Sequence, residues 1–123
     1  MTAHHKPAEP IGTHYIVEFL GCDPERIATV EAVRPVLEEA VRASKATAVH
    51  WAFHQFEPDG MSAAVLITES HLCVHSWPDR AYMSADVFTC GDTMVPDRAI
   101  EVMAEGFGSE TVQTSIMERG AGG

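Results

Sequence analysis

A serine, a histidine and a cysteine stand at spacings that suit self-cleavage followed by covalent chemistry. Ser70 directly follows the acidic Glu69. His75 comes five residues after that serine, and Cys90 comes twenty residues after it. A serine hydroxyl can attack the preceding carbonyl, a histidine can transfer protons near neutral pH, and a thiol can return a proton later. The set indicates a chain that cuts itself before Ser70 and then does chemistry at the new end.

The composition predicts one globular domain spanning residues 1–123, of which residues 1–11 form a flexible lead-in. Hydrophobic residues make up 46% of the chain and charged residues 21%, as in ordinary globular proteins. Eighteen acidic and eight basic side chains give a net charge of −10, which opposes nucleic-acid binding because such binding begins with phosphate neutralisation. No run of about 18 apolar residues occurs, so no membrane span is predicted.

The cysteine count favours a reducing compartment. Cys22, Cys73 and Cys90 make an odd number, and residues 1–7 lack the charged-then-apolar layout of a secretory signal. A disulfide framework is therefore not expected, and the cytoplasm is the predicted location.

Hydrophobic periodicity and turn residues predict an α+β fold. Strands are predicted at 13–20, 48–56, 61–68, 71–77, 82–89 and 111–117. Helices are predicted as a short turn after Pro24, a longer helix with Pro35 in its first turn, and residues 96–107. Consecutive strands joined by hairpins favour a two-layer sandwich, an antiparallel sheet with helices on one face. The other face must then meet water or a second subunit.

A metal site is an alternative interpretation of the histidines. His71, Cys73 and His75 alternate along one predicted strand and so share one of its faces. With His50 or His54 they could hold zinc or copper in a non-enzymatic domain. No CxxC motif accompanies them, and this ligand spacing along a strand is unusual for structural zinc. We therefore predict no metal.

The central motifs resemble those of the small prokaryotic S-adenosylmethionine decarboxylase proenzymes. The resemblance rests on Glu69-Ser70-His71, His75-Ser76-Trp77-Pro78 and Asp86-Val87-Phe88-Thr89-Cys90-Gly91-Asp92, and it extends from Gly12 to about Arg119. It implies cleavage between Glu69 and Ser70 into a β chain, residues 1–69, and an α chain, residues 70–123. Residue 70 would become a covalent pyruvoyl group, the self-made cofactor. The family match gives His75 and Ser62 roles in this processing.

The resemblance also implies the reaction of the processed enzyme. The substrate amine forms a Schiff base with the pyruvoyl carbonyl, carbon dioxide leaves, and Cys90 returns a proton to the substrate carbon. Phe56 and Trp77 match aromatic residues that enclose the adenine ring in the family. The product is decarboxylated S-adenosylmethionine, the aminopropyl donor of spermidine and polyamine biosynthesis. The processed protomers are expected to form a homodimer, a larger sandwich in which both copies contribute near each active site.

Two departures from the family pattern concern the substrate pocket. Asp79 stands where the family usually carries a glutamate associated with the ribose hydroxyls, and residues 80–85 replace a small, glycine-containing stretch. Pyruvoyl-dependent decarboxylases of ornithine or arginine use the same machinery with another pocket, so these substrates remain an alternative. Retention of Phe56 and Trp77 favours S-adenosylmethionine.

Overall fold

The structure is a computed structural model that describes residues 10–120. Residues 1–9 of the predicted lead-in lie outside the described part of the chain. The elements are β1 (Gly12–Leu20), α1 (Pro24–Ile27), α2 (Val30–Ala43), β2 (Ala48–Gln55), β3 (Met61–Ile67), β4 (Ser70–Trp77), the 3₁₀ helix η1 (Pro78–Arg80), β5 (Tyr82–Cys90), α3 (Pro96–Gly106) and β6 (Thr111–Arg119).

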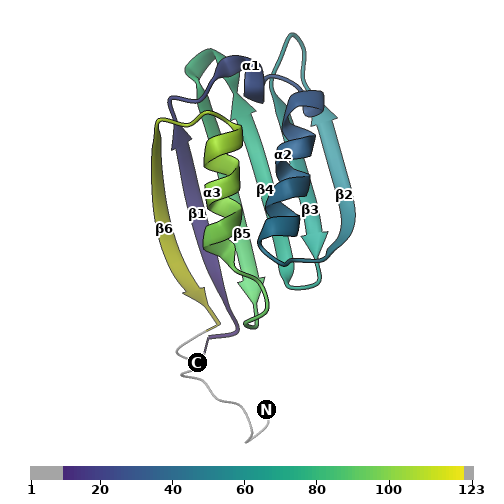
Figure 1. The fold of residues 1–123 in the computed structure, drawn as a ribbon, viewed down its shortest axis with the longest axis vertical. Coiled ribbons are helices and arrows are strands. Elements are labelled where there is room, and N and C mark those ends of the chain that lie inside the picture. The colour runs from purple at the N-terminus through teal and green to yellow at the C-terminus, as the bar shows by residue number, and fades with distance from the viewer. Residues whose placement is uncertain (1–9, 121–123) are drawn as a thin grey trace, which may run out of the picture.

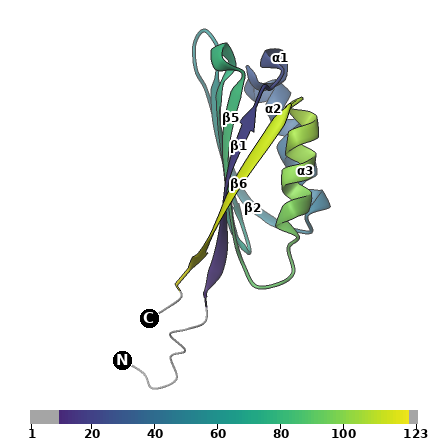
Figure 2. The same ribbon diagram turned by 90° about the vertical axis from the view of Figure 1, so that its left-hand side faces the viewer.

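The strands form one antiparallel sheet in the order β2-β3-β4-β5-β1-β6, which confirms the predicted α+β class. Helices α2 and α3 lie side by side across one face of this sheet (Figure 1). An edge-on view shows that both helices cover the same face and leave the opposite face bare (Figure 2). We call this uncovered surface the open face.

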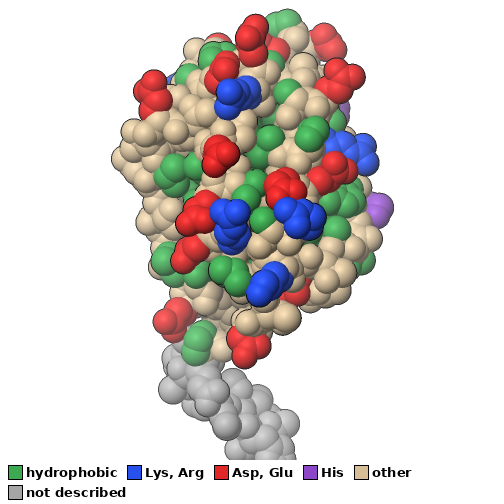
Figure 3. Space-filling view, viewed as in Figure 1, with side chains coloured by type: hydrophobic (Ala, Val, Ile, Leu, Met, Phe, Trp, Pro, Cys, Tyr) green, Lys and Arg blue, Asp and Glu red, His purple; other side chains and the backbone are tan. Residues whose placement is uncertain are grey.

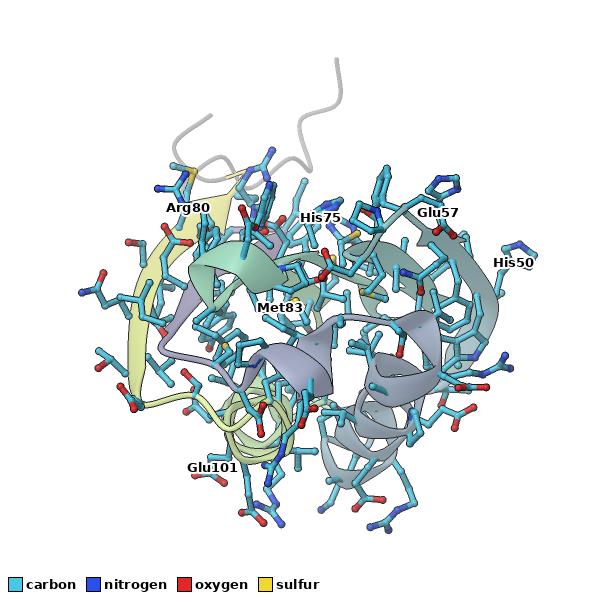
Figure 4. All side chains as sticks on the ribbon, turned by 90° about the horizontal axis from the view of Figure 1, so that it is seen from above. His50, Glu57, His75, Arg80, Met83 and Glu101 are labelled. Atoms are coloured by element: carbon cyan, nitrogen blue, oxygen red, sulfur yellow. The ribbon has the colours of Figure 1, made fainter. Side chains whose placement is uncertain are left out.

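Alternation along the strands separates a buried side from the open face. Val65, Val74 and Val87 are fully buried beneath the helices, and each is flanked in its strand by residues of the other side. Met83 points into the layer between sheet and helices, whereas His75 lies on the opposite side of the sheet (Figure 4). The core is therefore one-sided, and any chemistry on the open face is not shielded by the helices.

The helical layer is apolar inside and charged outside. The inward side of α2 buries Val33, Leu37, Ala40 and Val41. The two helices approach closely because a glycine lies at the contact: a Cβ on Gly106 would fall 2.6 Å from Val36. Acidic and basic side chains alternate over the outer surface (Figure 3), including a helical ion pair between Arg98 and Glu101 at 3.0 Å. None of the helices in residues 10–120 is long and apolar enough to cross a membrane.

Helix α2 corrects one prediction, the place of Pro35. The helix begins at Val30, so Pro35 lies inside it, in the second turn rather than the first. Thr29 explains the early start, because its side chain caps the helix by accepting a hydrogen bond from the Ala32 N–H at 3.1 Å. The proline therefore removes one helical hydrogen bond that packing must offset.

Strand boundaries differ from the predictions by one or two residues at several ends. The most consequential shift concerns β4, predicted to begin at His71, which begins instead at Ser70. Ser70 pairs with Ile67 in the hairpin and with Thr89 on the neighbouring strand. The serine at the expected cleavage point is thus a strand residue and not part of a loop.

Candidate active site

The Glu69–Ser70 bond lies at the tip of a tight β-hairpin. Only Thr68 and Glu69 connect β3 to β4, at the lower end of the sheet in Figure 1. Ser70 has a φ of 154°, a value that residues with a side chain rarely adopt. Backbone strain of this kind costs about 1–3 kcal/mol and tends to mark functional positions. Cleavage at this bond would release it.

The carbonyl group of Glu69 is held by the backbone of Cys90. The Cys90 N–H donates a hydrogen bond to the Glu69 oxygen at 2.8 Å. This oxygen would become negative during attack on the carbonyl carbon, and a fixed N–H donor stabilises such a charge. The structure thus brings three predicted residues, Glu69, Ser70 and Cys90, to one end of the sheet.

The other predicted residues gather in a pocket at the opposite end. A cavity of about 400 Å³ is lined by Phe56, Asp59, Gly60, Met61, Ser62, His75, Ser76, Trp77, Pro78 and Asp79. Phe56 and Trp77 are 47% and 44% exposed, so both rings offer surface to a ligand. Asp79 adds a carboxylate from η1 at the same rim. Aromatic rings with a nearby carboxylate can hold a flat base and a sugar hydroxyl.

Ser62 and His75 form a hydrogen-bonded pair beside this pocket. They are directly opposite in the β3–β4 register, and the Ser62 Oγ lies 2.8 Å from Nδ1 of His75. The contact orients the imidazole and leaves Nε2 as the nitrogen for a further partner. Both side chains lie on the open face, where a proton-transferring group could reach a molecule placed against the sheet.

A single protomer does not bring His75 to Ser70. The two residues are five apart on β4, which at about 3.3 Å per residue separates them by about 17 Å. Strand alternation also places them on opposite sides of the sheet. The predicted site therefore consists of two half-sites in one chain: the hairpin end, with Glu69, Ser70 and Cys90, and the pocket end, with Phe56, Ser62, His75, Trp77 and Asp79.

Sequence reasoning missed two residues that support the pocket wall. Tyr82 is paired with Trp77 across β4 and β5, and the two rings stack with centroids 5.4 Å apart. Its hydroxyl donates to the Glu18 carboxylate, and burial together with this bond raises the pKa of Tyr82 to about 12. The phenol therefore stays protonated at neutral pH. The sequence did contain a signal for this contact: Tyr82 is an aromatic residue five positions after Trp77, and the tight corner between them favours pairing of the two rings.

The histidines of the open face do not assemble a metal site. His71, Cys73 and His75 share that face as predicted, but within residues 10–120 no three His, Cys, Asp or Glu side chains converge to hold an ion. Burial and the nearby Asp86 raise the pKa of the Cys73 thiol, which disfavours the thiolate that a metal would need. Asp86 instead lies 3.0 Å from Nε2 of His14.

The structure is a two-layer α+β protein with its predicted site residues at both ends of one sheet. The chain belongs to the S-adenosylmethionine decarboxylase family, whose sequence profile matches residues 13–120. The family inferred from the motifs is thereby confirmed.

Individual relatives agree with this assignment. The chain is 40% identical over 110 residues to the S-adenosylmethionine decarboxylase proenzyme of Acidithiobacillus ferrooxidans, covering 89% of this chain and 83% of the relative. It is 38% identical to the corresponding proenzyme of Pseudomonas aeruginosa, with coverages of 95% and 73%. The crystal structure of the adenosylmethionine decarboxylase from Aquifex aeolicus superposes with a TM-score of 0.85 at 31% identity, covering 91% of this chain and 92% of that one.

Proposed function

We propose that this protein is a proenzyme that cleaves itself between Glu69 and Ser70 and then decarboxylates S-adenosylmethionine, yielding the aminopropyl donor for polyamine synthesis. The observation that carries the proposal is the strained Ser70 at a hairpin tip, whose preceding carbonyl is held by the Cys90 N–H at 2.8 Å. Family membership supports the same chemistry. The free cysteines fit a cytoplasmic location.

Self-cleavage begins with attack of the Ser70 Oγ on the Glu69 carbonyl carbon. A C–O bond forms, the C–N bond breaks, and the proton lost by the hydroxyl is balanced by one gained at the Ser70 nitrogen. The Cys90 N–H stabilises the oxygen while it is negative. Removal of the Ser70 Cα proton then breaks the ester, which leaves Glu69 as a carboxylate end and residue 70 as a dehydroalanine. Water hydrolyses the imine tautomer of this residue to a ketone and releases ammonia. His75, oriented by Ser62, is suited to these proton transfers when a second copy of the chain brings it to the bond.

The residues at the hairpin end fit a pyruvoyl group made in place from Ser70. Such a group supplies an electron sink for decarboxylation of an α-amino acid. Cys90 lies on the strand directly beside β4, on the open face, and its thiol can return a proton to the substrate carbon. Backbone and side chain of Cys90 thus serve different steps.

The pocket end fits the nucleoside half of the substrate. Phe56 and Trp77 would enclose the adenine ring, and the electron-rich faces of the rings tolerate a neighbouring sulfonium. Asp79 would accept hydrogen bonds from the ribose hydroxyls. A carboxylate one methylene shorter than glutamate requires the ribose to lie slightly closer to η1. Ornithine and arginine have no group for the aromatic pair, so they remain the weaker alternative.

A homodimer would unite the two half-sites. Two open faces can pack about 10 Å apart around a two-fold axis that lies between them and runs across the strands. This axis places the pocket end of one protomer over the hairpin end of its partner. Exposed apolar side chains on the open face, including Ile16, Leu66 and Met117, would be buried. His75 and Ser62 would then act on the partner's cleavage bond.

Electrophoresis of the purified protein tests self-cleavage directly. The wild type should separate into two fragments under denaturing conditions, the smaller one lacking a free amino terminus, while Ser70→Ala stays a single chain. Release of labelled carbon dioxide from carboxyl-labelled S-adenosylmethionine, ornithine and arginine then identifies the substrate. A wild-type chain that remains whole through long incubation would overturn the proposed function. Turnover of ornithine or arginine alone would overturn only its substrate.

A further inference from the structure

Thr89 carries an unexplained hydroxyl next to the cleavage bond. Its side chain is 6% exposed, and its Oγ1 is the single buried side-chain oxygen or nitrogen in residues 10–120 without a hydrogen-bond partner there. Leaving a buried hydroxyl unpaired lowers the stability of the folded chain. Valine has nearly the same shape and would avoid this cost, so the hydroxyl at this position calls for a functional reason.

The strand register places Thr89 directly opposite Ser70. The two residues are Cα partners in the β4–β5 ladder. Thr89 belongs to the helix-covered side of β5, together with Val87 and Ala85. Ser70 belongs to the same side, because it also pairs with Ile67, which is buried beneath the helices. Side chains directly opposite each other on one side of a sheet have Cβ atoms about 4.5–5.5 Å apart, within reach of a hydroxyl–hydroxyl hydrogen bond.

We propose that Thr89 is a positioning residue for self-cleavage, whose hydroxyl holds the Ser70 hydroxyl in the rotamer that attacks the Glu69 carbonyl. The inference rests on the proposed self-cleavage. Thr89 accepts a hydrogen bond from the Ser70 O–H as the Oγ approaches the carbonyl carbon. Thr89 neither gains nor loses a proton overall, since the proton that leaves Ser70 Oγ is balanced by the one taken up by the departing Ser70 nitrogen.

The geometry around Ser70 explains why a second hydroxyl is useful there. Among the hydrogen bonds between described residues, none involves the Ser70 side chain, so its rotamer is not otherwise held by one. The Cys90 N–H binds the Glu69 oxygen within the plane of the sheet, which leaves the faces of the carbonyl carbon open to attack. Thr89 lies next to Ser70 on the helix-covered side of the sheet, whereas a partner's His75 would approach from the open face.

Thr89→Val separates this role from a structural one. Removing an unpaired buried hydroxyl should leave the melting temperature unchanged or raise it, yet cleavage should slow by about ten- to a hundredfold, the effect of a misplaced reacting group. Thr89→Ser should restore most of the rate because it keeps the hydroxyl. Thr13→Val is the matched control. Thr13 pairs with Thr89 from β1, the strand on the opposite edge of β5 from β4, so it is not a neighbour of Ser70. This variant should cleave at the wild-type rate.

Time courses on denaturing gels, with and without hydroxylamine, measure the outcome. Hydroxylamine cuts an accumulated ester, so Thr89→Val should show no extra cleavage with it if the hydroxyl acts in the first step. Four results would each overturn the inference and leave the proposed function standing. Two concern cleavage rates: a wild-type rate in Thr89→Val, or equal slowing in Thr13→Val. The other two concern Thr89→Val: a clear drop in its melting temperature, or accumulation of a hydroxylamine-sensitive ester. An uncleaved wild type would overturn both.

Discussion

Cys90 contributes two chemically separate groups at one position. Its backbone N–H holds the Glu69 carbonyl at 2.8 Å, and its thiol belongs to the open face of β5. A substitution of the side chain leaves the N–H in place. The two proposed steps, cleavage and decarboxylation, can therefore be separated at this residue.

Cys90→Ala should still cleave itself but lose most of its turnover. The oxyanion donor is retained, whereas the acid that returns a proton to the substrate carbon is lost, a contribution of about 10²–10⁴-fold for general acid catalysis. Gel analysis gives the cleaved fraction, and carbon dioxide release per cleaved chain gives the rate. Normal turnover in Cys90→Ala would show that another group supplies the proton.

Phe56→Ala and Trp77→Ala should raise KM for S-adenosylmethionine far more than they lower kcat. Loss of one stacking partner costs about 1–3 kcal/mol of base binding. Asp79→Asn should weaken binding of the ribose while sparing the aromatic contacts. Trp51→Phe is the control, because Trp51 stacks on Phe53 outside this pocket. Unchanged KM values in both alanine variants would show that the adenine ring does not bind between Phe56 and Trp77.

At the scale of elements, short connections decide where the chemical groups lie. The two-residue β3–β4 turn brings the scissile bond to the edge of the sheet, and η1 carries Asp79 to the pocket rim. The corner between η1 and β5 is formed by Ala81, which has a left-handed backbone with φ 51° and ψ 40°. This is the place where the sequence departs from the glycine-containing family pattern.

Ala81→Gly should stabilise the protein. A side chain in the left-handed region costs about 1 kcal/mol, which glycine avoids, although part of the gain is offset by the greater freedom of glycine in the unfolded chain. The melting temperature should rise by up to a few degrees in a domain of this size. Calorimetry of the uncleaved Ser70→Ala protein measures it without interference from processing. A lower melting temperature would show that the corner needs the alanine methyl group.

At the scale of the molecule, the open face holds apolar residues, the pocket residues Ser62 and His75, and the Cys90 thiol, without a covering layer. Helices cover only the other face (Figure 2). Because the proposed half-sites lie at opposite ends of β4, the proposed site would need a second copy of the chain to be complete. Sedimentation of the purified protein should therefore give a dimer at micromolar concentration, and a monomer that cleaves and turns over would contradict the shared site.

Coexpression of two inactive variants tests the sharing itself. Ser70→Ala and His75→Ala should each remain uncut alone. In a mixed dimer, the His75→Ala chain has an intact Ser70, and its partner supplies an intact His75. Fragments of the His75→Ala chain should therefore appear only on coexpression, and a size tag identifies them. No cleavage in the mixture, with mixed dimers present, would indicate that each chain processes itself.

The sequence alone determined the local features of this protein. Alternation and helical periodicity predicted the α+β class and the order of elements, because these patterns depend on neighbouring residues. The residue types around Ser70 and Cys90, and the spacing between them, indicated the family. The match of the family profile to residues 13–120 confirmed it. Pro35 was placed wrongly because the Thr29 cap, a single local hydrogen bond, outweighed the disfavoured proline.

Only the tertiary structure decided how distant residues meet. Strand register, set by pairing across the whole sheet, gave Glu69 its Cys90 donor, placed Thr89 opposite Ser70 and set Tyr82 against Trp77. The extended backbone of β4 separates His75 from Ser70 by about 17 Å, although the two are near in sequence. A strand advances about 3.3 Å per residue and alternates its faces, so closeness in sequence becomes distance in space.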